Sequence, residues 1–313
     1  MGTMLNLARS VRAFAKEWTR ERDSAPPVTA RSPRIGLALS GGFARGFAHI
    51  GVLKVLEENR VPIHFIAGTS VGSIIGAAYC SGTSLKELEE IAVLVKFRDF
   101  ARFTFSRLGL CSNDRMAVLL DRCLKARTFE ELKIPLAVTA TDFITGEGAV
   151  WTSGPLVDPV RASCAYPGMF LPVRVNGRLY VDGLLAHAVP TRPLRDMGAE
   201  RVVAIHLSAQ WANYGPRHVF DVIGQCFSIA QAKMSGYWQS AADVVITPDV
   251  RGFSYDAFDN AKALVQSGER AAREMLPQLL ACVRESTTGQ QVTSTLAIAA
   301  ASATLPATKP SAA

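Results

Sequence analysis

Two kinds of hydrophobic pattern alternate along residues 35–270. Short, wholly apolar runs predict buried β-strands, and stretches in which apolar residues recur every three or four positions predict helices. The strands are expected at residues 35–39, 63–67, 134–141 and 202–207, and the helices at residues 44–58, 74–79 and 85–95. Ser84 and Glu87 have the spacing of a capping box before the last of these helices. This alternation predicts an α/β fold whose central sheet is mainly parallel and is flanked by helices.

A pentapeptide of the form G-x-S-x-G (residues 68–72, Gly-Thr-Ser-Val-Gly) lies between one predicted strand and the next predicted helix. Strand, sharp turn and helix in this order are typical of a nucleophile elbow, which lifts a serine hydroxyl out of the backbone at the positive end of the helix. Gly68 and Gly72 would let the two elements approach closely. Taken alone, the pentapeptide is as typical of an ordinary turn, because glycine and serine are common in turns.

A glycine-rich turn, Ser-Gly-Gly-Phe at residues 40–43, joins the first predicted strand to the first predicted helix. Such a turn leaves backbone N–H groups unpaired, and these groups can bind a phosphate or the oxyanion formed during ester hydrolysis. Arg45 is placed to hold the loop or to add positive potential. The alternative is a simple βα turn without a ligand. A nucleotide site is disfavoured, because the motifs G-x-x-x-x-G-K-[ST] and G-x-G-x-x-G are absent from the sequence.

Residues 178–185 predict a strand that ends in Asp182 and Gly183, which places a carboxylate at the edge of a cleft. Asp-Gly is also one of the commonest turn dipeptides, so this signal is weak when taken alone. A serine hydroxyl needs a base within hydrogen-bonding reach, and a carboxylate can serve if burial raises its pKa. Only the fold can bring Ser70 and Asp182 together, because they lie far apart in the chain.

The order and spacing of these three segments, together with residues 140–146 and 161–168, resemble the patatin-like phospholipases, specifically the small bacterial members. The resemblance runs from about Arg34 to about Ser208 and implies a three-layer fold with a nucleophile elbow. It also implies hydrolysis of phospholipid or lysophospholipid acyl esters through an acyl-enzyme, by a Ser–Asp dyad without histidine, cofactor or metal. The implied site residues are Ser70 as nucleophile, Asp182 as base, Gly41, Gly42 and Phe43 as the oxyanion hole, Arg45 and Gly46 as loop support, Gly68 and Gly72 as the elbow glycines, and Gly183 after the acid.

Two positions depart from the family pattern. Phe43 stands where the family usually has a third glycine or a small residue, and its side chain resists a positive φ. His187 and Ala188 stand where the family usually has Asn or Asp followed by Pro. We favour a packing or surface role for His187. Two other functions stay open: a regulator that keeps the fold without hydrolysis, and a serine hydrolase whose base is His187, His206 or His218.

Composition narrows the class of protein. The chain has 313 residues, of which 49% are hydrophobic, enough for a sizeable core. Its net charge of +7 is scattered rather than gathered in basic blocks, which disfavours nucleic acid as a partner. An acyl-ester lipid is the expected substrate, and an anionic membrane surface is a second candidate partner. The six cysteines form no C-x-x-C pair or zinc-ligand spacing, which favours reduced core residues of an intracellular protein.

The ends of the chain differ from the middle. Residues 1–33 form a basic amphipathic segment and a Pro-containing linker, residues 34–284 the expected catalytic domain, and residues 285–313 an Ala-, Ser- and Thr-rich tail expected to be disordered. No apolar stretch has the length of a membrane span, so we expect a cytoplasmic protein, with peripheral attachment to the inner membrane as a further expectation. Residues 97–108 hold four Phe and three Arg, which fits either a helix packed on the core or a mobile cap over an acyl-binding cleft.

Overall fold

A central β-sheet organises residues 32–208 and 219–284, which are the residues that the computed structural model describes. Its strands are β1 (Ile35–Leu39), β2 (Phe65–Thr69), β5 (Leu136–Asp142), β6 (Gly148–Trp151), β8 (Val173–Val175), β9 (Arg178–Asp182), β10 (Arg201–Ile205) and β11 (Val244–Ile246). The strand order is β11-β10-β1-β2-β5-β9-β8, and β6 pairs with β5. The strands from β11 to β5 are parallel, whereas β5 pairs antiparallel with β6 and β9, and β9 pairs antiparallel with β8. The predicted mainly parallel sheet is confirmed.

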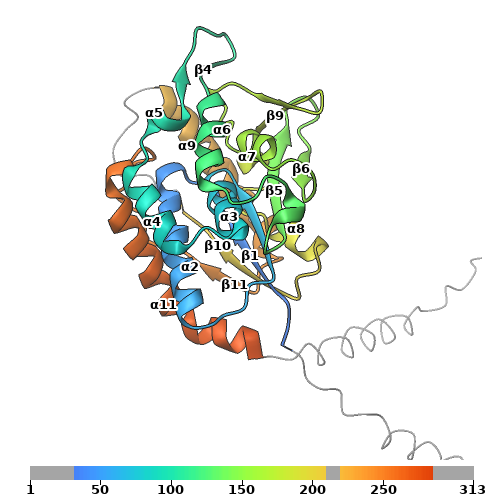
Figure 1. The fold of residues 1–313 in the computed structure, drawn as a ribbon, viewed down its shortest axis with the longest axis vertical. Coiled ribbons are helices and arrows are strands. Elements are labelled where there is room, and N and C mark those ends of the chain that lie inside the picture. The colour runs from blue at the N-terminus through green and yellow to red at the C-terminus, as the bar shows by residue number, and fades with distance from the viewer. Residues whose placement is uncertain (1–31, 209–218, 285–313) are drawn as a thin grey trace, which may run out of the picture. The chain divides into compact units, whose positions relative to one another are not determined.

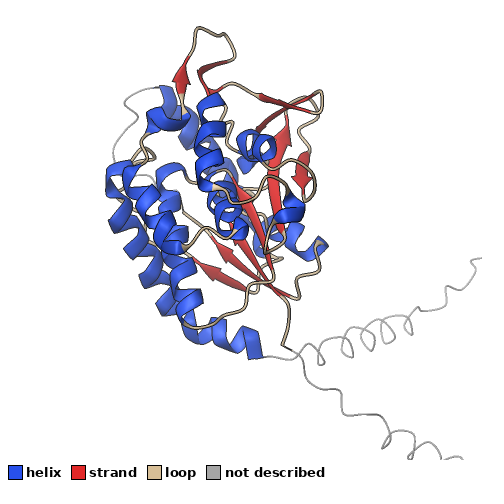
Figure 2. Cartoon of the chain, in the orientation of Figure 1, coloured by secondary structure: helices blue, strands red, loops and turns tan. Residues whose placement is uncertain are grey.

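Helices cover both faces of this sheet (Figures 1 and 2). The longer helices are α2 (Ala48–Glu58), α3 (Val71–Ser81), α4 (Leu85–Leu94), α6 (Asp114–Cys123), α7 (Val157–Ser163), α9 (Val219–Lys233) and α11 (Ala261–Arg284). The shorter ones are α5 (Phe97–Phe100), α8 (Thr191–Asp196), α10 (Ser235–Gln239) and the 3₁₀ turns η1 (Phe43–Phe47), η2 (Phe129–Glu131), η3 (Gly183–Leu185) and η4 (Phe258–Asn260). The long helices α2 and α11 pack side by side (Figure 1).

The predicted strands and helices are present, with ends displaced by a few residues. The capping box before α4 is also confirmed, since the Ser84 hydroxyl accepts a hydrogen bond from the amide of Glu87. The helix expected from Ala44 begins instead as the 3₁₀ turn η1 and becomes α-helical at Ala48. The tighter winding follows directly from the glycine-rich turn, as is common at helix N-termini.

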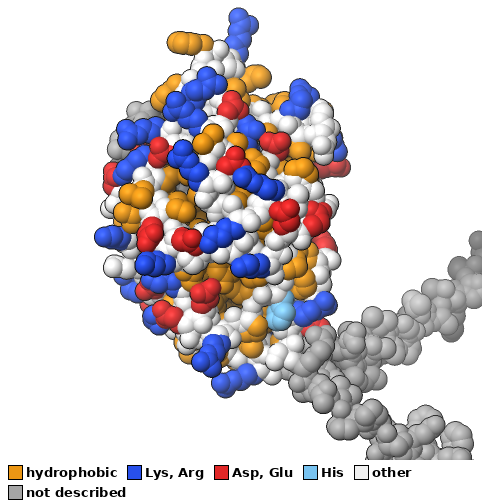
Figure 3. Space-filling model, in the orientation of Figure 1, with side chains coloured by type: hydrophobic (Ala, Val, Ile, Leu, Met, Phe, Trp, Pro, Cys, Tyr) orange, Lys and Arg blue, Asp and Glu red, His pale blue; other side chains and the backbone are white. Residues whose placement is uncertain are grey.

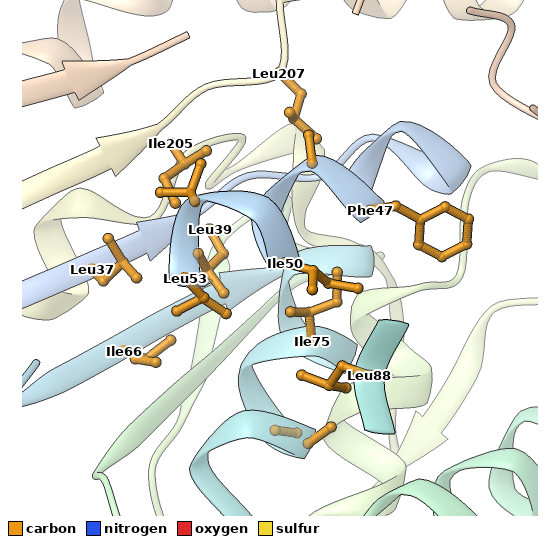
Figure 4. Packing of buried hydrophobic residues seen from close by; sticks show 14 of the residues in the cluster. Leu37, Leu39, Phe47, Ile50, Leu53, Ile66, Ile75, Leu88, Ile205 and Leu207 are labelled. Carbon is orange, nitrogen blue, oxygen red and sulfur yellow. The ribbon is translucent and has the colours of Figure 1, made fainter. Parts of the chain in front are cut away.

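The two faces of the sheet bury different side chains, because successive residues of a strand point to opposite sides. On one face, Leu39, Ile66 and Ile205 lie beneath Ile50 and Leu53 of α2 in the largest hydrophobic cluster (Figure 4). The apolar cleft described below lies on this face of the sheet, because Ile50 and other residues of the same cluster line it.

The opposite face carries small side chains. Ala38, Ala67 and Ala204 pack there against Leu194 of α8 and Trp238 of α10. Because alanine fills little space, α8 lies close to the sheet and anchors the chain that follows β9.

The segment from Phe97 to Leu108 is not one helix. Helix α5 ends at Phe100, and a hairpin of β3 (Arg102–Phe103) and β4 (Gly109–Ser112) follows, with β7 (Gly168–Phe170) paired to β4. The rings of Phe97, Phe100 and Phe170 contact one another, whereas Phe103 and Phe105 are exposed. Of the two expectations for this segment, the helix with its Phe face on the core is correct for the first half and wrong for the second, and the mobile cap stays a prediction.

The cysteines follow the sequence-based expectation with one exception. Within the described residues all six are free thiols, and each is buried except Cys226 on α9. The N-terminal segment and the tail predicted from composition lie outside the described residues. Among the helices that the structure describes, none is both long enough and apolar enough to cross a lipid bilayer.

Candidate active site

Ser70 occupies the sharp turn between β2 and α3 with a backbone φ of 53° and ψ of −125°. A positive φ is unfavourable for a residue with a Cβ, so the surroundings must hold it. The Ser70 amide donates to Ser163 Oγ at 2.7 Å, and Ser73 Oγ donates to the Ser70 carbonyl at 2.6 Å. Both ends of the residue are therefore bonded to buried hydroxyl groups, which leaves its own side chain free to point away from the backbone.

The two elbow glycines are required by close backbone packing. A Cβ on Gly72 would lie 2.3 Å from the carbonyl oxygen of Leu39, and a Cβ on Gly68 would lie 2.5 Å from the carbonyl oxygen of Gly72. Neither position has room for a side chain. Gly46 is similarly constrained, because a Cβ there would lie 2.3 Å from Val71 Cγ1. The elbow and the glycine-rich turn are thus packed directly against each other.

Asp182 lies within hydrogen-bonding distance of Ser70, although 112 positions separate them in the chain. Ser70 Oγ donates to Asp182 Oδ2 at 2.7 Å, and the amide of Leu184 donates to Oδ1 at 2.9 Å. The Asp182 side chain is fully buried, and this burial raises the pKa of its carboxyl group to about 7, against the opposing effect of the two hydrogen bonds. A carboxylate with a pKa near neutrality is suited to accept and return a proton.

The strand that carries Asp182 is held in place by hydroxyl groups from neighbouring strands. Thr141 Oγ1 donates to the Asp182 carbonyl at 3.0 Å, and the hydroxyls of Thr69 and Thr139 are 2.7 Å apart. A Cβ on Gly183 would lie 2.5 Å from the carbonyl oxygen of Thr139, so glycine is needed after the acid. These contacts fix the distance between the elbow and the acid.

The glycine-rich turn lies beside the serine. A Cβ on Gly41 would lie 3.3 Å from the Cβ of Ser70. The flanking amides are paired, because Ser40 donates to the Ile205 carbonyl and Ala44 to the Tyr255 carbonyl. In residues 32–208 and 219–284, the amides between them have no protein acceptor; they belong to Gly41, Gly42 and Phe43. Three adjacent unpaired donors next to Ser70 form a suitable site for an oxyanion.

Phe43 adopts the backbone conformation that its side chain was expected to resist, with a φ of 51°. Its ring contacts Tyr166 edge-to-face at a centroid distance of 5.3 Å and Tyr255 at 6.2 Å. Such aromatic contacts offset part of the cost of the unfavourable φ. The side chain therefore holds the turn in shape at a position where the family usually has a small residue.

Two cavities of different character meet at Ser70 and Phe43. An apolar cleft follows the helical faces of α3, α4 and α6, and a polar pocket lies on the other side of Ser70. The cleft is lined from these helices by Val71, Ile74, Ile75, Ala78, Leu88, Ile91, Ala92, Val95, Met116, Leu119 and Cys123. The polar pocket includes Ser40, Arg45, His206, Ser228, Gln231 and Tyr255. Ser70 thus stands between an apolar and a polar space.

Arg45 is a buried cation in the wall of the polar pocket. Its guanidinium carbon lies 3.7 Å from the centroid of the Tyr255 ring, and only 5% of the residue is exposed. Its Nε atom has no hydrogen-bond partner within the described part of the chain. A buried cation that keeps a free donor gives the pocket positive potential beside the unpaired amides.

The three histidines considered as alternative bases have different positions. His187 packs its ring against Gly148, and His206 lines the polar pocket with its ring centroid 5.0 Å from that of Trp238. Burial lowers the pKa of His206 to about 4. Among the described residues, neither ring forms a hydrogen bond with Ser70 or Asp182. His218 lies outside the described residues.

Ser163 is the site residue that sequence reasoning missed. It lies within residues 161–168, which carried part of the family resemblance, but no role had been assigned to it. The available signal was a hydroxyl residue among apolar neighbours near the end of a helix. Its contact with Ser70 depends on the packing of α7 against the elbow. No group of three His, Cys, Asp or Glu side chains that could hold a metal ion occurs in the part of the chain that the structure describes.

Comparison with known proteins agrees with this geometry. The family model for patatin-like phospholipase matches residues 37–195, about half of the chain. The chain belongs to the patatin-like phospholipase family. The matched region contains the glycine-rich turn, the elbow and Asp182, so the family assignment rests on the same segments that build the site.

Proteins similar to this chain occur in bacteria, animals and fungi. An uncharacterised NTE family protein of Mycobacterium tuberculosis is 34% identical over 184 residues, which cover 58% of this chain and 51% of that protein. The human patatin-like phospholipase domain-containing protein 6 is 32% identical over 189 residues, or 56% of this chain and 13% of that protein. Lysophospholipase NTE1 of Mycosarcoma maydis is 27% identical over 229 residues, or 70% of this chain and 12% of that protein. The chain thus spans about half the length of the mycobacterial relatives and much less of the others.

Among solved structures, VipD from Legionella pneumophila aligns with a TM-score of 0.46 and 13% sequence identity. The alignment covers 82% of this chain and 68% of VipD.

Proposed function

We propose that this protein is a serine acyl hydrolase that cleaves fatty-acyl esters of phospholipids or lysophospholipids. The observation that carries the proposal is the 2.7 Å hydrogen bond from Ser70 Oγ to the buried Asp182 carboxylate, beside three amides without an acceptor among the described residues. Nucleophile, base and oxyanion donors are the three components that acyl transfer requires. Membership of the patatin-like phospholipase family supports the same reaction class.

In the proposed mechanism, Ser70 Oγ attacks the ester carbonyl carbon while Asp182 Oδ2 takes the hydroxyl proton. The negative charge on the carbonyl oxygen is stabilised by the amides of Gly41, Gly42 and Phe43. The C–O bond to the alcohol then breaks, and the alcohol leaves with the proton from Asp182. In the second half, Asp182 takes a proton from water, the resulting hydroxide attacks the acyl-enzyme, and the fatty acid leaves as Ser70 regains its proton.

The two cavities suggest how an amphiphilic ester would be oriented. The apolar cleft along α3 is suited to a fatty-acyl chain, because its walls are aliphatic and aromatic. The polar pocket, with its buried Arg45, is suited to the alcohol part of the ester, including a phosphate. The name of the lysophospholipase relative supports a lipid of this class. We further propose that the enzyme works in the cytoplasm and meets its substrate at a membrane surface.

A histidine-based serine hydrolase is less well supported, since Asp182 contacts Ser70 directly and the rings of His187 and His206 do not. The regulator alternative makes a different prediction, namely that the folded protein hydrolyses no acyl ester at all. Activity measurements on wild type therefore separate it from the proposed enzyme.

The test is hydrolysis of a short-chain p-nitrophenyl ester, a phospholipid and a lysophospholipid by wild type and by Ser70→Ala. We expect wild type to hydrolyse the ester and at least one of the lipids, and the variant to lose about 10⁴-fold or more of this activity. Circular dichroism shows that the variant is folded. Wild type that is folded but inactive on all three substrates would contradict the proposal and favour a regulator.

A further inference from the structure

The hairpin of β3 and β4 carries exposed hydrophobic side chains at its tip. Phe103 is 77% exposed, Phe105 is fully exposed and Leu108 is 68% exposed. In the space-filling view, hydrophobic side chains project at the top of the molecule, where Figure 1 places the β4 hairpin (Figure 3). A cluster of exposed aromatic and aliphatic side chains on a protruding loop is unusual for a surface that only meets water.

Basic side chains surround this tip. From Lys96 to Arg115, both included, the sequence has five Lys or Arg and two Asp, and Lys96 is paired with Asp259 at 2.5 Å. One of the two acids, Asp114, is paired with Arg161 at 2.6 Å, and Arg102 lies 3.6 Å from the same carboxylate. Arg102 and Arg107 are themselves exposed. The net charge around the apolar tip is therefore positive, which complements an anionic surface.

The hairpin is also a defined structure and not a loose loop. The Thr104 amide donates to the Leu110 carbonyl at 2.9 Å, and the Leu108 amide donates to Ser106 Oγ at 3.1 Å. Donor and acceptor of both bonds lie within the hairpin, so the tip keeps these two bonds when it enters a lipid interface, where an unpaired backbone group is costly.

The hairpin joins the walls of the apolar cleft. It begins directly after Phe100, and β4 pairs with β7, which ends at Phe170. Both Phe100 and Phe170 line the cleft that reaches Ser70. A lipid surface held at the hairpin would consequently be held by the same elements that shape the cleft.

We propose that the β3–β4 hairpin is a lipid-surface anchor, which inserts Phe103, Phe105 and Leu108 among the acyl chains while Arg102 and Arg107 contact anionic headgroups. The choice of a lipid surface as the partner rests on the proposed function of the adjacent site. Aromatic rings at the headgroup level with basic residues beside them are the combination that interfacial binding favours.

The experiment measures flotation of the full chain with vesicles of phosphatidylcholine alone and of an equimolar mixture with phosphatidylglycerol. We expect wild type to float with the anionic vesicles and Phe103→Ser/Phe105→Ser to bind at least about tenfold more weakly, because two rings no longer leave water. Phe143→Ser is the matched control, since Phe143 is an exposed phenylalanine (56%) outside the hairpin. Its binding should stay within about twofold of wild type.

The basic side chains are tested with Arg102→Gln/Arg107→Gln. This variant should lose binding to the anionic vesicles, and the binding of wild type should weaken in high salt, because screening reduces attraction between charges. Hydrolysis of a soluble short-chain ester should be unchanged in every hairpin variant, which shows that the variants are folded.

Binding and catalysis are separated by Ser70→Ala, which should float like wild type. Flotation by Ser70→Ala together with an inactive wild type would contradict the proposed function and leave the anchor supported. The anchor itself is overturned if wild type does not float, if the double Phe variant floats like wild type, or if the Phe143 control loses binding equally. It is also overturned if size-exclusion chromatography shows a wild-type dimer that the double Phe variant lacks, without vesicle binding, because the tip would then pack against a second copy.

Discussion

Two turns follow neighbouring parallel strands and lead into helices, but they differ in how their backbone groups are hydrogen-bonded. The turn after β2 has the Ser70 amide and carbonyl both bonded to buried hydroxyls, and its glycines contact backbone atoms. The turn after β1 leaves the amides of Gly41, Gly42 and Phe43 without a protein acceptor within the described residues. In the turn after β2, hydrogen bonds hold the backbone of Ser70, and its side chain is the group available for chemistry. In the turn after β1, the backbone amides are the groups available to bind a ligand.

This difference bears on how the proposed Ser70–Asp182 dyad would work without a histidine. The Ser70 amide and carbonyl are both held by hydroxyl groups, Ser163 Oγ and Ser73 Oγ, so the surrounding packing rather than a histidine positions Ser70 Oγ against Asp182. The unpaired amides have no partner to exchange when an oxyanion forms, so little reorganisation is needed. We therefore expect substitutions in the elbow to lower the stability of the fold, and substitutions in the glycine-rich turn to lower mainly the catalytic activity.

After loss of the nucleophile, the largest expected effect comes from removing the base. Asp182→Asn should lower kcat/KM for a p-nitrophenyl ester by about 10³-fold, because the amide cannot take the Ser70 proton. His206→Ala, the matched change on the polar-pocket side, should stay within about threefold, because this ring forms no hydrogen bond with Ser70. The reverse ranking, in which His206→Ala is the more damaging change, would point to a histidine base.

A glycine-to-alanine substitution in each turn tests whether the two turns differ in this way. Gly72→Ala should unfold or strongly destabilise the protein, because the new Cβ would lie 2.3 Å from the Leu39 carbonyl oxygen. Gly41→Ala should keep most of the stability, since the nearest atom would be 3.3 Å away, and should lose activity, because that atom belongs to Ser70. Urea unfolding and ester hydrolysis give the two readouts. Equal stability loss in both variants would show that the turns do not differ as described.

The pKa of Asp182 predicts a pH dependence of activity. Because burial raises this pKa to about 7, the carboxyl group is protonated below neutrality and cannot act as the base. We expect kcat/KM to fall about tenfold for each pH unit below 7 and to level off above it. A profile that is flat between pH 5 and 8 would contradict a buried Asp182 base.

Stability should change in the opposite direction to activity. A carboxyl group whose pKa is higher in the folded than in the unfolded state favours folding while it is protonated. That contribution is lost as pH rises from about 4, its value in unfolded chains, to about 7. Thermal unfolding of wild type and of Asp182→Asn across this range checks the sign. The Asn variant should lose less stability than wild type as pH rises.

The smallest effect is expected at Ser163. Ser163→Ala removes the acceptor for the Ser70 amide and should lower kcat by about tenfold, with KM little changed, because it shifts the nucleophile without touching substrate. Ser163→Thr keeps the hydroxyl and should restore part of the rate. A KM increase with unchanged kcat would show that Ser163 does not position the elbow.

The sequence predicted what depends on local pattern. Hydrophobic runs and helical spacing located β1, β2, β5 and β10, and the G-x-S-x-G motif located the turn at Ser70. The pairing of Ser70 with Asp182 came only through the family resemblance, since no periodicity links residues so far apart.

Long-range packing explains the rest. The positive φ of Phe43, the position of Arg45 over the Tyr255 ring and the bond from Ser70 to Ser163 each depend on segments that meet only in the folded chain. The hairpin after Phe100 was missed because its Phe and Arg spacing also fits an amphipathic helix. Local propensity could not distinguish the two, and the pairing of β4 with β7 decides it.

The most direct test of the Ser70–Asp182 dyad is covalent labelling with an alkyl fluorophosphonate, followed by mass spectrometry of the digested protein. We expect one adduct, on Ser70, which forms at the wild-type rate in His206→Ala and about 10³-fold more slowly in Asp182→Asn. An adduct on another residue, or labelling of Ser70 at an unchanged rate in Asp182→Asn, would contradict it.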